Sequence, residues 1–178
     1  MANFELIKAQ IIPIEGGYVF DADDPGGETK YGISKHSYPD LDIKNLTLDE
    51  AAVIYKRDFW DVMRLDEVSD QSIAESIFWF GVNSGTKTSI QYLQKSMNIL
   101  EDAAILPIDG IIGKMTLRWV NYEYTICDYC ESSDIPRYQT LLLEALKLEQ
   151  IHYYANIANN KPSQQKFLLG WINRVFKT

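Results

Sequence analysis

Residues 137–158 repeat mostly apolar side chains at the spacing of an α-helix. The side chains that follow the i, i+3, i+4, i+7 pattern are Tyr138, Leu141, Leu142, Ala145, Leu148, His152 and Ala155. This pattern puts them on one face of a long amphipathic helix. No segment shows a strong alternation of apolar and polar residues, and short strands are expected only within residues 18–34. We therefore predict a mainly α fold with at most a short β-hairpin near residues 18–34.

Other segments also have helical patterns, and local signals mark some of their ends. Thr47 and Glu50 form a capping box, so a helix is predicted from there to about residue 59. Pro13 has no N–H group and clashes with the preceding turn, so it is expected to interrupt the apolar segment that begins at residue 3. Further helices are predicted at about residues 70–83, 87–99 and 114–124.

The chain carries a formal net charge of −8 at pH 7. Nucleic acids and anionic lipids are bound by basic faces, so neither is expected as a partner. No apolar run approaches the roughly 18 residues that a membrane-spanning helix needs, which predicts no membrane insertion. The first residues lack the basic segment, apolar stretch and cleavage site of a signal peptide, so we expect synthesis in the cytoplasm without one. We also expect a monomer.

The segment EGGYVFDADDPGGETKYGIS, residues 15–34, concentrates acidic side chains and glycines behind the first predicted helix. Gly16 and Gly17 accept the left-handed backbone that ends helices, so Glu15 is expected at a helix C-terminus. The negative end of the helix dipole disfavours a further negative charge, which raises the pKa of a carboxyl group there. A carboxylic acid that stays protonated near neutral pH can act as a general acid. On composition alone, the simpler interpretation of Glu15 is a solvated side chain at a helix end.

The aspartates of this segment could hold a cation or line a catalytic pocket. Counted from Asp21, an EF-hand calcium loop would need a ligand at its fifth position and a glutamate at its twelfth. Pro25 and Gly32 occupy these positions, so no such loop is expected. In the alternative interpretation, Asp24 and Thr29 hold a water molecule by hydrogen bonds in a pocket wall.

Two tyrosines of the same segment have two possible roles. Tyr18 and Tyr31 could stack on sugar rings in such a pocket, or they could pack within the core or the hairpin. The sequence alone leaves both interpretations open.

The two cysteines, Cys127 and Cys130, form a CxxC motif. A structural zinc site needs four ligands, and the only two histidines, His36 and His152, have no matching spacing. The sequence therefore predicts two ordinary thiols, no metal site and no cofactor.

Motifs along nearly the whole chain resemble a known pair of protein modules. The motifs of the first half are Glu15-Gly16-Gly17-Tyr18, Asp23-Asp24-Pro25-Gly26-Gly27, Thr29, Tyr31-Gly32-Ile33, Tyr38-Pro39, Phe59-Trp60 and Val82-Asn83-Ser84-Gly85. They resemble glycoside hydrolase family 108, the lysozyme-like N-acetylmuramidases of bacteria and phages. The motifs of the second half are Asp109-Gly110, Ile112-Gly113 and Gly170-Trp171-Ile172-Asn173-Arg174. They resemble the predicted peptidoglycan-binding domain that is usually attached to that module.

The resemblance implies a lysozyme-like helical fold. It also implies a muramidase region at residues 1–88 and a peptidoglycan-binding-like region at residues 89–178, packed as one compact unit. The second region could bind glycan directly or could serve to pack against the catalytic lobe.

The resemblance also implies roles for single residues. The family's clear catalytic glutamate maps onto Glu15. Phage-type lysozymes place an aspartate nine residues after theirs, and Asp24 lies at that interval here, with Asp23 as its competitor. Glu15 and Asp24 are therefore the candidate catalytic residues. The candidate substrate-binding residues are Thr29, Tyr18, Tyr31 and Asn83.

The expected function is that of a glycosidase of the lysozyme type. Such a muramidase hydrolyses the bond between N-acetylmuramic acid and N-acetylglucosamine, degrades the cell wall after release or export, and has peptidoglycan glycan strands as its partner. Bacteriophage or prophage endolysins act in this way. The alternative is a non-catalytic peptidoglycan-binding or secretion-accessory protein of the secretion-activator type. The acidic charge favours this alternative, because cell walls are often anionic, whereas the intact Glu15 motif favours the enzyme.

Overall fold

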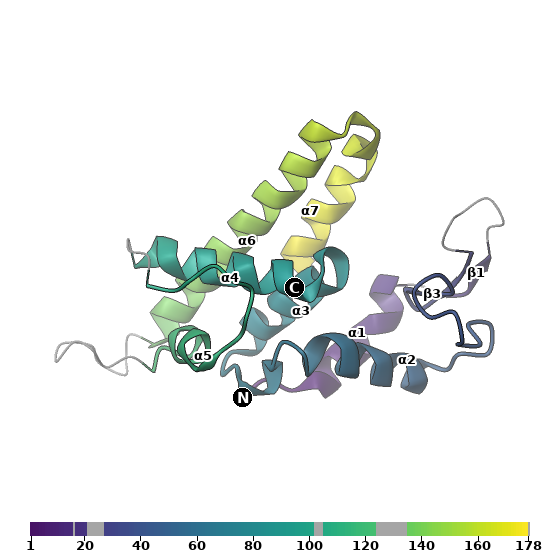
Figure 1. Cartoon of the computed structure of the whole chain (residues 1–178), viewed down its shortest axis with the longest axis horizontal. Coiled ribbons are helices and arrows are strands. Elements are labelled where there is room, and N and C mark those ends of the chain that lie inside the picture. The colour runs from purple at the N-terminus through teal and green to yellow at the C-terminus, as the bar shows by residue number, and fades with distance from the viewer. Residues whose placement is uncertain (16, 21–26, 102–104, 124–134, 178) are drawn as a thin grey trace. The chain divides into compact units, whose positions relative to one another are not determined.

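The structure is a computed structural model of the whole chain. It describes residues 1–15, 17–20, 27–101, 105–123 and 135–177, and the side chains of residues 12–15 are not described. Within this part the chain forms seven α-helices and one small antiparallel sheet, which confirms the prediction of a mainly α fold (Figure 1). The chain divides into two compact units, one made of residues 3–61 and the other of residues 1–2 and 62–178. The expected boundary at residues 88 and 89, and the packing of the two halves as one unit, stay predictions.

The N-terminal unit, residues 3–61, combines two helices with the sheet. Its elements are α1 (Phe4–Glu15), β1 (Val19–Phe20), β2 (Glu28–Lys30), β3 (Ile33–Ser34), α2 (Leu48–Tyr55) and a π-helical turn (Lys56–Trp60). The strands pair antiparallel in the order β1-β2-β3, with Val19 opposite Thr29 and Lys30 opposite Ile33. The described strands therefore lie where the sequence predicted them, inside residues 18–34.

Apolar side chains of both helices form the core of this unit. Phe4 packs edge-on against Trp60, with ring centroids 5.5 Å apart, and both side chains are buried. The predicted capping box is present: the Glu50 amide donates to Thr47 Oγ1, and the Thr47 amide donates to Glu50 Oε2 over 2.8 Å. The prediction that Pro13 interrupts the first helix is wrong. Proline has no N–H group to bond the Ala9 carbonyl, but this loss does not end the helix, since α1 continues through residue 13 to Glu15.

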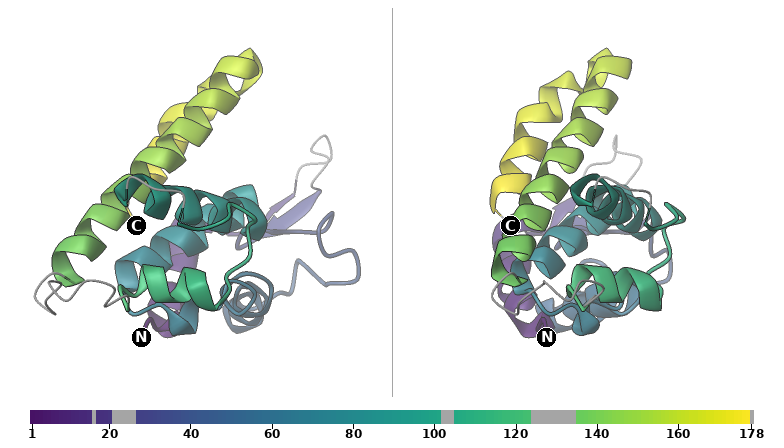
Figure 2. Two further views of the ribbon diagram at one scale, coloured as in Figure 1. Left: turned by 60° about the vertical axis from the view of Figure 1, so that its left-hand side comes forward. Right: turned by 90° about the vertical axis from the view of Figure 1, so that its left-hand side faces the viewer.

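In its described part, the C-terminal unit has only helices as regular elements, joined by loops. Its elements are a 3₁₀ turn (Leu65–Glu67), α3 (Gln71–Ser84), α4 (Thr86–Leu100), α5 (Lys114–Val120), α6 (Ile135–Asn160), a second 3₁₀ turn (Pro162–Phe167) and α7 (Leu168–Lys177). α3 and α4 pack against each other and against α6, while α6 and α7 form a helical hairpin (Figure 2). Phe80, Tyr154 and Val175 join α3, α6 and α7 in one buried cluster. Among the described helices, none combines the length and apolar character needed to cross a membrane.

Candidate functional site

The two predicted catalytic residues lie at the edge of what the structure describes. Glu15 is the last residue of α1, which confirms the predicted helix end, but its side chain lies outside the described part. Asp24 also lies outside the described residues, together with Asp21 and Asp23. Their assignment as catalytic residues therefore stays a prediction.

The small sheet that follows α1 carries two of the predicted substrate-binding residues. Thr29 lies in the middle strand, paired with Val19 on one side and Ser34 on the other. Tyr18 directly precedes β1, and its hydroxyl donates to Glu28 Oε1 over 3.1 Å. This bond ties the start of β1 to β2 and leaves the Tyr18 side chain 40% exposed.

An exposed aromatic ring next to Tyr18 was missed by the sequence analysis. The Phe20 side chain is 62% exposed, although phenylalanine is usually buried. Tyr18, directly before β1, and Phe20, its last residue, are two positions apart, the spacing at which side chains of a strand share a face. The signal in the sequence was the i, i+2 spacing of two aromatic residues. Both rings are accessible to solvent, as stacking on sugar rings requires.

Tyr31 has a backbone role in the turn between β2 and β3. Its φ is +53° and that of Gly32 is +74°, as in the tight turns that join antiparallel strands. The Tyr31 carbonyl accepts a hydrogen bond of 2.9 Å from the hydroxyl of Tyr55, a buried residue of α2. The Lys30 ammonium group lies 5.5 Å from the centroid of the Tyr31 ring. The turn residue thus anchors the sheet to α2, and its stacking on sugar stays a prediction.

A further acidic residue of this unit, Asp58, is committed to structural bonds. Arg57 donates to both of its carboxylate oxygens, over 2.5 and 2.6 Å, and the hydroxyl of Tyr38 donates to Oδ2 over 2.8 Å. The bonds from Arg57 lower the pKa of Asp58, whereas burial and the bond to Asp58 raise the pKa of Tyr38 to about 12. Asp58 is therefore ionised at neutral pH and is a poor general acid.

Asn83, the remaining predicted substrate-binding residue, belongs to the C-terminal unit. It lies near the end of α3, and its Nδ2 donates to the Trp79 carbonyl over 2.7 Å. Its Oδ1 accepts a bond of 2.6 Å from Nη1 of Arg174 in α7. Trp171, which shares a helix face with Arg174, stacks on Tyr154 at a centroid distance of 5.2 Å. In this structure Asn83 therefore links α3 to α7.

The C-terminal unit also holds a cavity of about 430 Å³, here called the loop cavity. Its lining residues are Val62, Met63, Arg64, Thr86, Lys87, Ile90, Asp109, Gly110, Ile111 and Ile112. One wall is the loop formed by residues 109–112, and another is the first turn of α4. The lining brings together positive and negative side chains from three separate segments.

The buried amide of Gln94 holds the loop from inside the unit. Gln94 Nε2 donates to Asp109 Oδ1 over 2.8 Å and to the Ile111 carbonyl over 3.1 Å, and Gln94 Oε1 accepts from the Gly110 amide over 2.9 Å. The Ile111 amide also donates to Asp109 Oδ1 over 2.8 Å. The bond from Gln94 and the bond from Ile111 lower the pKa of Asp109, so its carboxylate is ionised at neutral pH.

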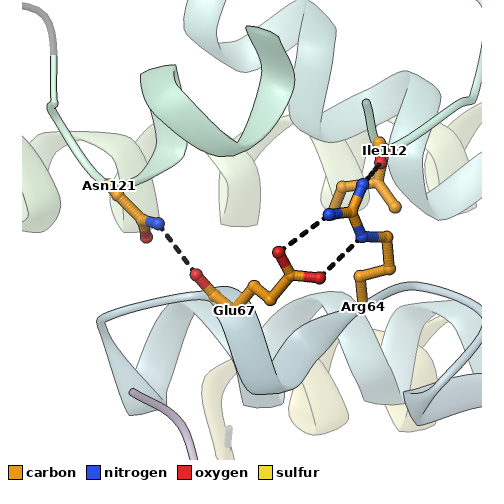
Figure 3. A network of polar contacts seen from close by, with 4 residues as sticks. All are labelled: Arg64, Glu67, Ile112 and Asn121. Carbon is orange, nitrogen blue, oxygen red and sulfur yellow. Dashed lines mark hydrogen bonds and ion pairs between the residues drawn. The ribbon is translucent and has the colours of Figure 1, made fainter. Parts of the chain in front are cut away.

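Arg64 also holds this loop, through the carbonyl of Ile112 (Figure 3). Its Nη1 donates to the Ile112 carbonyl over 3.0 Å, while Nε and Nη2 donate to the two carboxylate oxygens of Glu67 over 2.7 and 2.8 Å. Asn121 Nδ2 donates to the Glu67 carbonyl over 2.8 Å, which completes the network. The guanidinium group lowers the pKa of Glu67.

Comparisons with known families divide the chain into two domains. The model of the family described as Glycosyl hydrolase 108 matches residues 8–85, and that described as Predicted Peptidoglycan domain matches residues 88–176. The chain thus joins a glycosyl hydrolase 108 domain in its first half to a predicted peptidoglycan domain in its second half. This confirms the resemblance noted in the sequence. It supports a role in peptidoglycan hydrolysis or binding, and peptidoglycan as the partner.

A solved structure of SagA from Brucella abortus has a similar fold. The TM-score is 0.72 and the sequence identity 22%, over 98% of this chain and 90% of that chain. SagA is one of 11 chains of solved structure that match. No curated protein matches the chain. At this identity, the likeness to SagA establishes the fold of the chain and nothing further.

Removing the bonds of Gln94 should destabilise the peptidoglycan domain. We expect Gln94→Met, which keeps the length of the side chain, to lower the free energy of unfolding by about 1–3 kcal/mol, because buried polar groups of the loop lose their partners. The matched control is Gln91→Met. Gln91 lies one turn earlier in α4 and makes no hydrogen bond through its side chain within the described part. Thermal and urea unfolding measure the difference, and equal stability of the two variants would contradict the role given to Gln94.

The described residues contain no group of three or more His, Cys, Asp or Glu side chains that could hold a metal ion. The aspartates at 21–24 and the CxxC cysteines lie outside this part. From the sequence we expect that excess EDTA changes neither the activity of the glycosyl hydrolase 108 domain nor its melting temperature. A tightly held ion would stabilise the fold by several kcal/mol, since stabilisation follows RT ln(1 + [L]/Kd). A large drop in melting temperature on chelation, reversed by calcium, would show that the aspartates bind a cation.

Proposed function

We propose that this protein cleaves the glycan strand of peptidoglycan between N-acetylmuramic acid and N-acetylglucosamine. The observation that carries the proposal is the position of Glu15. It is the last residue of α1, it stands directly before the sheet, and it lies in the region that matches the glycosyl hydrolase 108 family. In the proposal Glu15 is the general acid.

The chemistry of glycoside hydrolysis defines what the other groups must do. Glu15 donates a proton to the oxygen that leaves C1 of muramic acid, and positive charge develops on the sugar ring. Asp24 either stabilises that charge or activates a water molecule that Thr29 helps to hold. A carboxyl separation of about 6.5–9.5 Å would favour inversion at the sugar, and one of about 5–5.5 Å would favour retention.

The sheet supplies the surface for the sugar rings in this proposal. Tyr18 and Phe20 expose aromatic side chains, and such rings can cover the apolar faces of sugars while neighbouring polar groups bond the hydroxyls. Tyr31 extends this surface at the turn, where its ring is half-buried. Asn83 contributes to substrate binding only if ligand replaces its bond to Arg174.

Analysis of the new chain ends tests the proposed bond. Purified peptidoglycan is digested, the products are reduced with borohydride, and the reduced sugars are identified by mass spectrometry after acid hydrolysis. A muramidase yields reduced muramic acid, whereas cleavage of the other glycosidic bond yields reduced glucosamine. Retention on the same peptidoglycan in a pull-down, without new reducing ends, would instead support the non-catalytic binding or secretion-accessory role.

A further inference from the structure

We propose that the loop cavity binds the peptide stem of peptidoglycan, by a free carboxylate and a free amino group of one stem. The inference rests on the proposed function, because it assumes that the protein acts on peptidoglycan. It assigns a second recognition site, distinct from the catalytic residues, and a chemical class of ligand to that site.

The size and lining of the cavity fit a short peptide. Its volume of about 430 Å³ is in the range of small-ligand sites and can hold one or two amino-acid residues. Ile90 and Ile112 are buried in its wall, whereas Val62 and Ile111 are mostly exposed at its rim. The described lining contains no aromatic ring, so it lacks the platform on which a sugar would stack.

Two cationic side chains of the cavity can bind a carboxylate. Arg64 uses three of its five N–H groups on Glu67 and Ile112, which leaves one on each terminal nitrogen for a ligand. Lys87 is exposed, and within the described part of the chain its ammonium group has no hydrogen bond or ion pair. The two groups therefore provide N–H donors without a hydrogen-bond partner in the described part, although the charge of Lys87 already acts on Asp109.

Asp109 supplies the opposite charge for an amino group. Its Oδ1 atom already accepts bonds from Gln94 and from the Ile111 amide. No other described residue donates a hydrogen bond to its Oδ2 atom, and the side chain is exposed. An ammonium group of the ligand can bind there while the carboxylate of the same residue faces Lys87.

The two charges match a peptide stem better than a glycan. The N-acetylated sugars of a glycan strand carry no free amino group, and their hydroxyls gain little from ionised partners of both signs. A stem peptide that contains diaminopimelate carries a carboxylate and an amino group on one carbon when that residue is not cross-linked. Charge-assisted bonds to both groups are stronger than neutral ones.

The cavity is held in shape before a ligand arrives. Gly110 has a φ of +76°, and a Cβ atom there would lie 2.6 Å from Cγ of Lys87 and 2.8 Å from its carbonyl oxygen. This close approach packs the aliphatic part of Lys87 on the loop. Since Gln94 and Arg64 both fix the loop, little conformational freedom is lost on binding.

Binding of a soluble stem peptide tests the inference directly. The probe is a tripeptide with a terminal diaminopimelate, and its affinity for the full chain is measured by calorimetry. We expect Lys87→Gln and Asp109→Asn each to weaken binding about tenfold or more, and Lys161→Gln, the same change on an exposed residue elsewhere in the unit, to have no effect. A probe with its amino group acetylated and its carboxylates amidated should not bind. Unchanged affinity in both cavity variants, or equal binding of the blocked probe, would overturn the inference.

A second measurement separates this inference from the proposed function. The chain is incubated with intact peptidoglycan and with glycan strands from which an amidase has removed the stems. Weaker retention on the stripped strands, with reducing ends still released from intact peptidoglycan, supports the inference. Equal retention on both materials contradicts it and leaves the proposed function standing. Release of no reducing ends contradicts the proposed function, whatever the tripeptide does.

Discussion

Glu15→Gln should lower the rate of peptidoglycan hydrolysis by about 10²–10⁴-fold, the contribution that general acid catalysis typically makes. The amide has almost the same shape as the carboxyl group, but it has no proton to donate at the required acidity. Glu15 is the last residue of α1, so the substitution should leave the helix intact and the melting temperature close to that of the wild type. The release of reducing ends over time, measured beside a thermal melt, gives both quantities.

The other end of the same helix provides a matched control. Glu5 is exposed in the first turn of α1, and Glu5→Gln makes the same chemical change far from the predicted acid. We expect this variant to keep the wild-type rate. Wild-type hydrolysis by Glu15→Gln would rule out the acid assignment. If Glu15→Gln loses activity because it unfolds, the measurement is repeated with Glu15→Asp, which keeps a titrating carboxyl group.

Local signals in the sequence were sufficient to predict most of the helical framework. The capping box at Thr47 and Glu50 involves residues three apart, and the structure has both of its bonds. The N-terminus of α3 similarly depends on Asp70, whose side chain accepts from the Ile73 amide over 2.9 Å. Pro13 was misjudged because a proline removes one helical bond, to the carbonyl four residues earlier, without always ending the helix, and α1 continues to Glu15.

The candidate sites were predictable only where their residues are close in sequence. Glu15 precedes two glycines, and this adjacent pattern located the helix end. The loop cavity gave no such signal, because Arg64 bonds the carbonyl of Ile112, 48 positions away. In the sequence, a single arginine or lysine cannot be distinguished from any solvated basic side chain. Only the packed structure brings Arg64, Lys87 and Asp109 to one cavity.

Asp24→Asn should lower the turnover of a defined glycan oligomer much more than Asp23→Asn does, while Asp23→Asn should cost more stability. The interval of nine residues from Glu15 favours Asp24, by resemblance to phage-type lysozymes. Asp24 also precedes Pro25, and the residue before a proline is restricted to extended backbone conformations. Such a residue can present its carboxylate in a fixed direction, whereas an aspartate one position earlier is well suited to brace a turn.

The measurements are kcat on the oligomer and the melting temperature of each variant. Asp40→Asn, at an exposed position of the same unit, makes the same chemical change and should alter neither quantity. Loss of turnover in a folded Asp23→Asn variant, with Asp24→Asn active, would exchange the two roles. If both variants keep their turnover, no second carboxylate is needed at either position. Hydrolysis would then depend on Glu15 and on a water molecule held by neutral groups such as Thr29, and direct attack of that water on the face of C1 opposite the leaving oxygen would invert the configuration at the sugar.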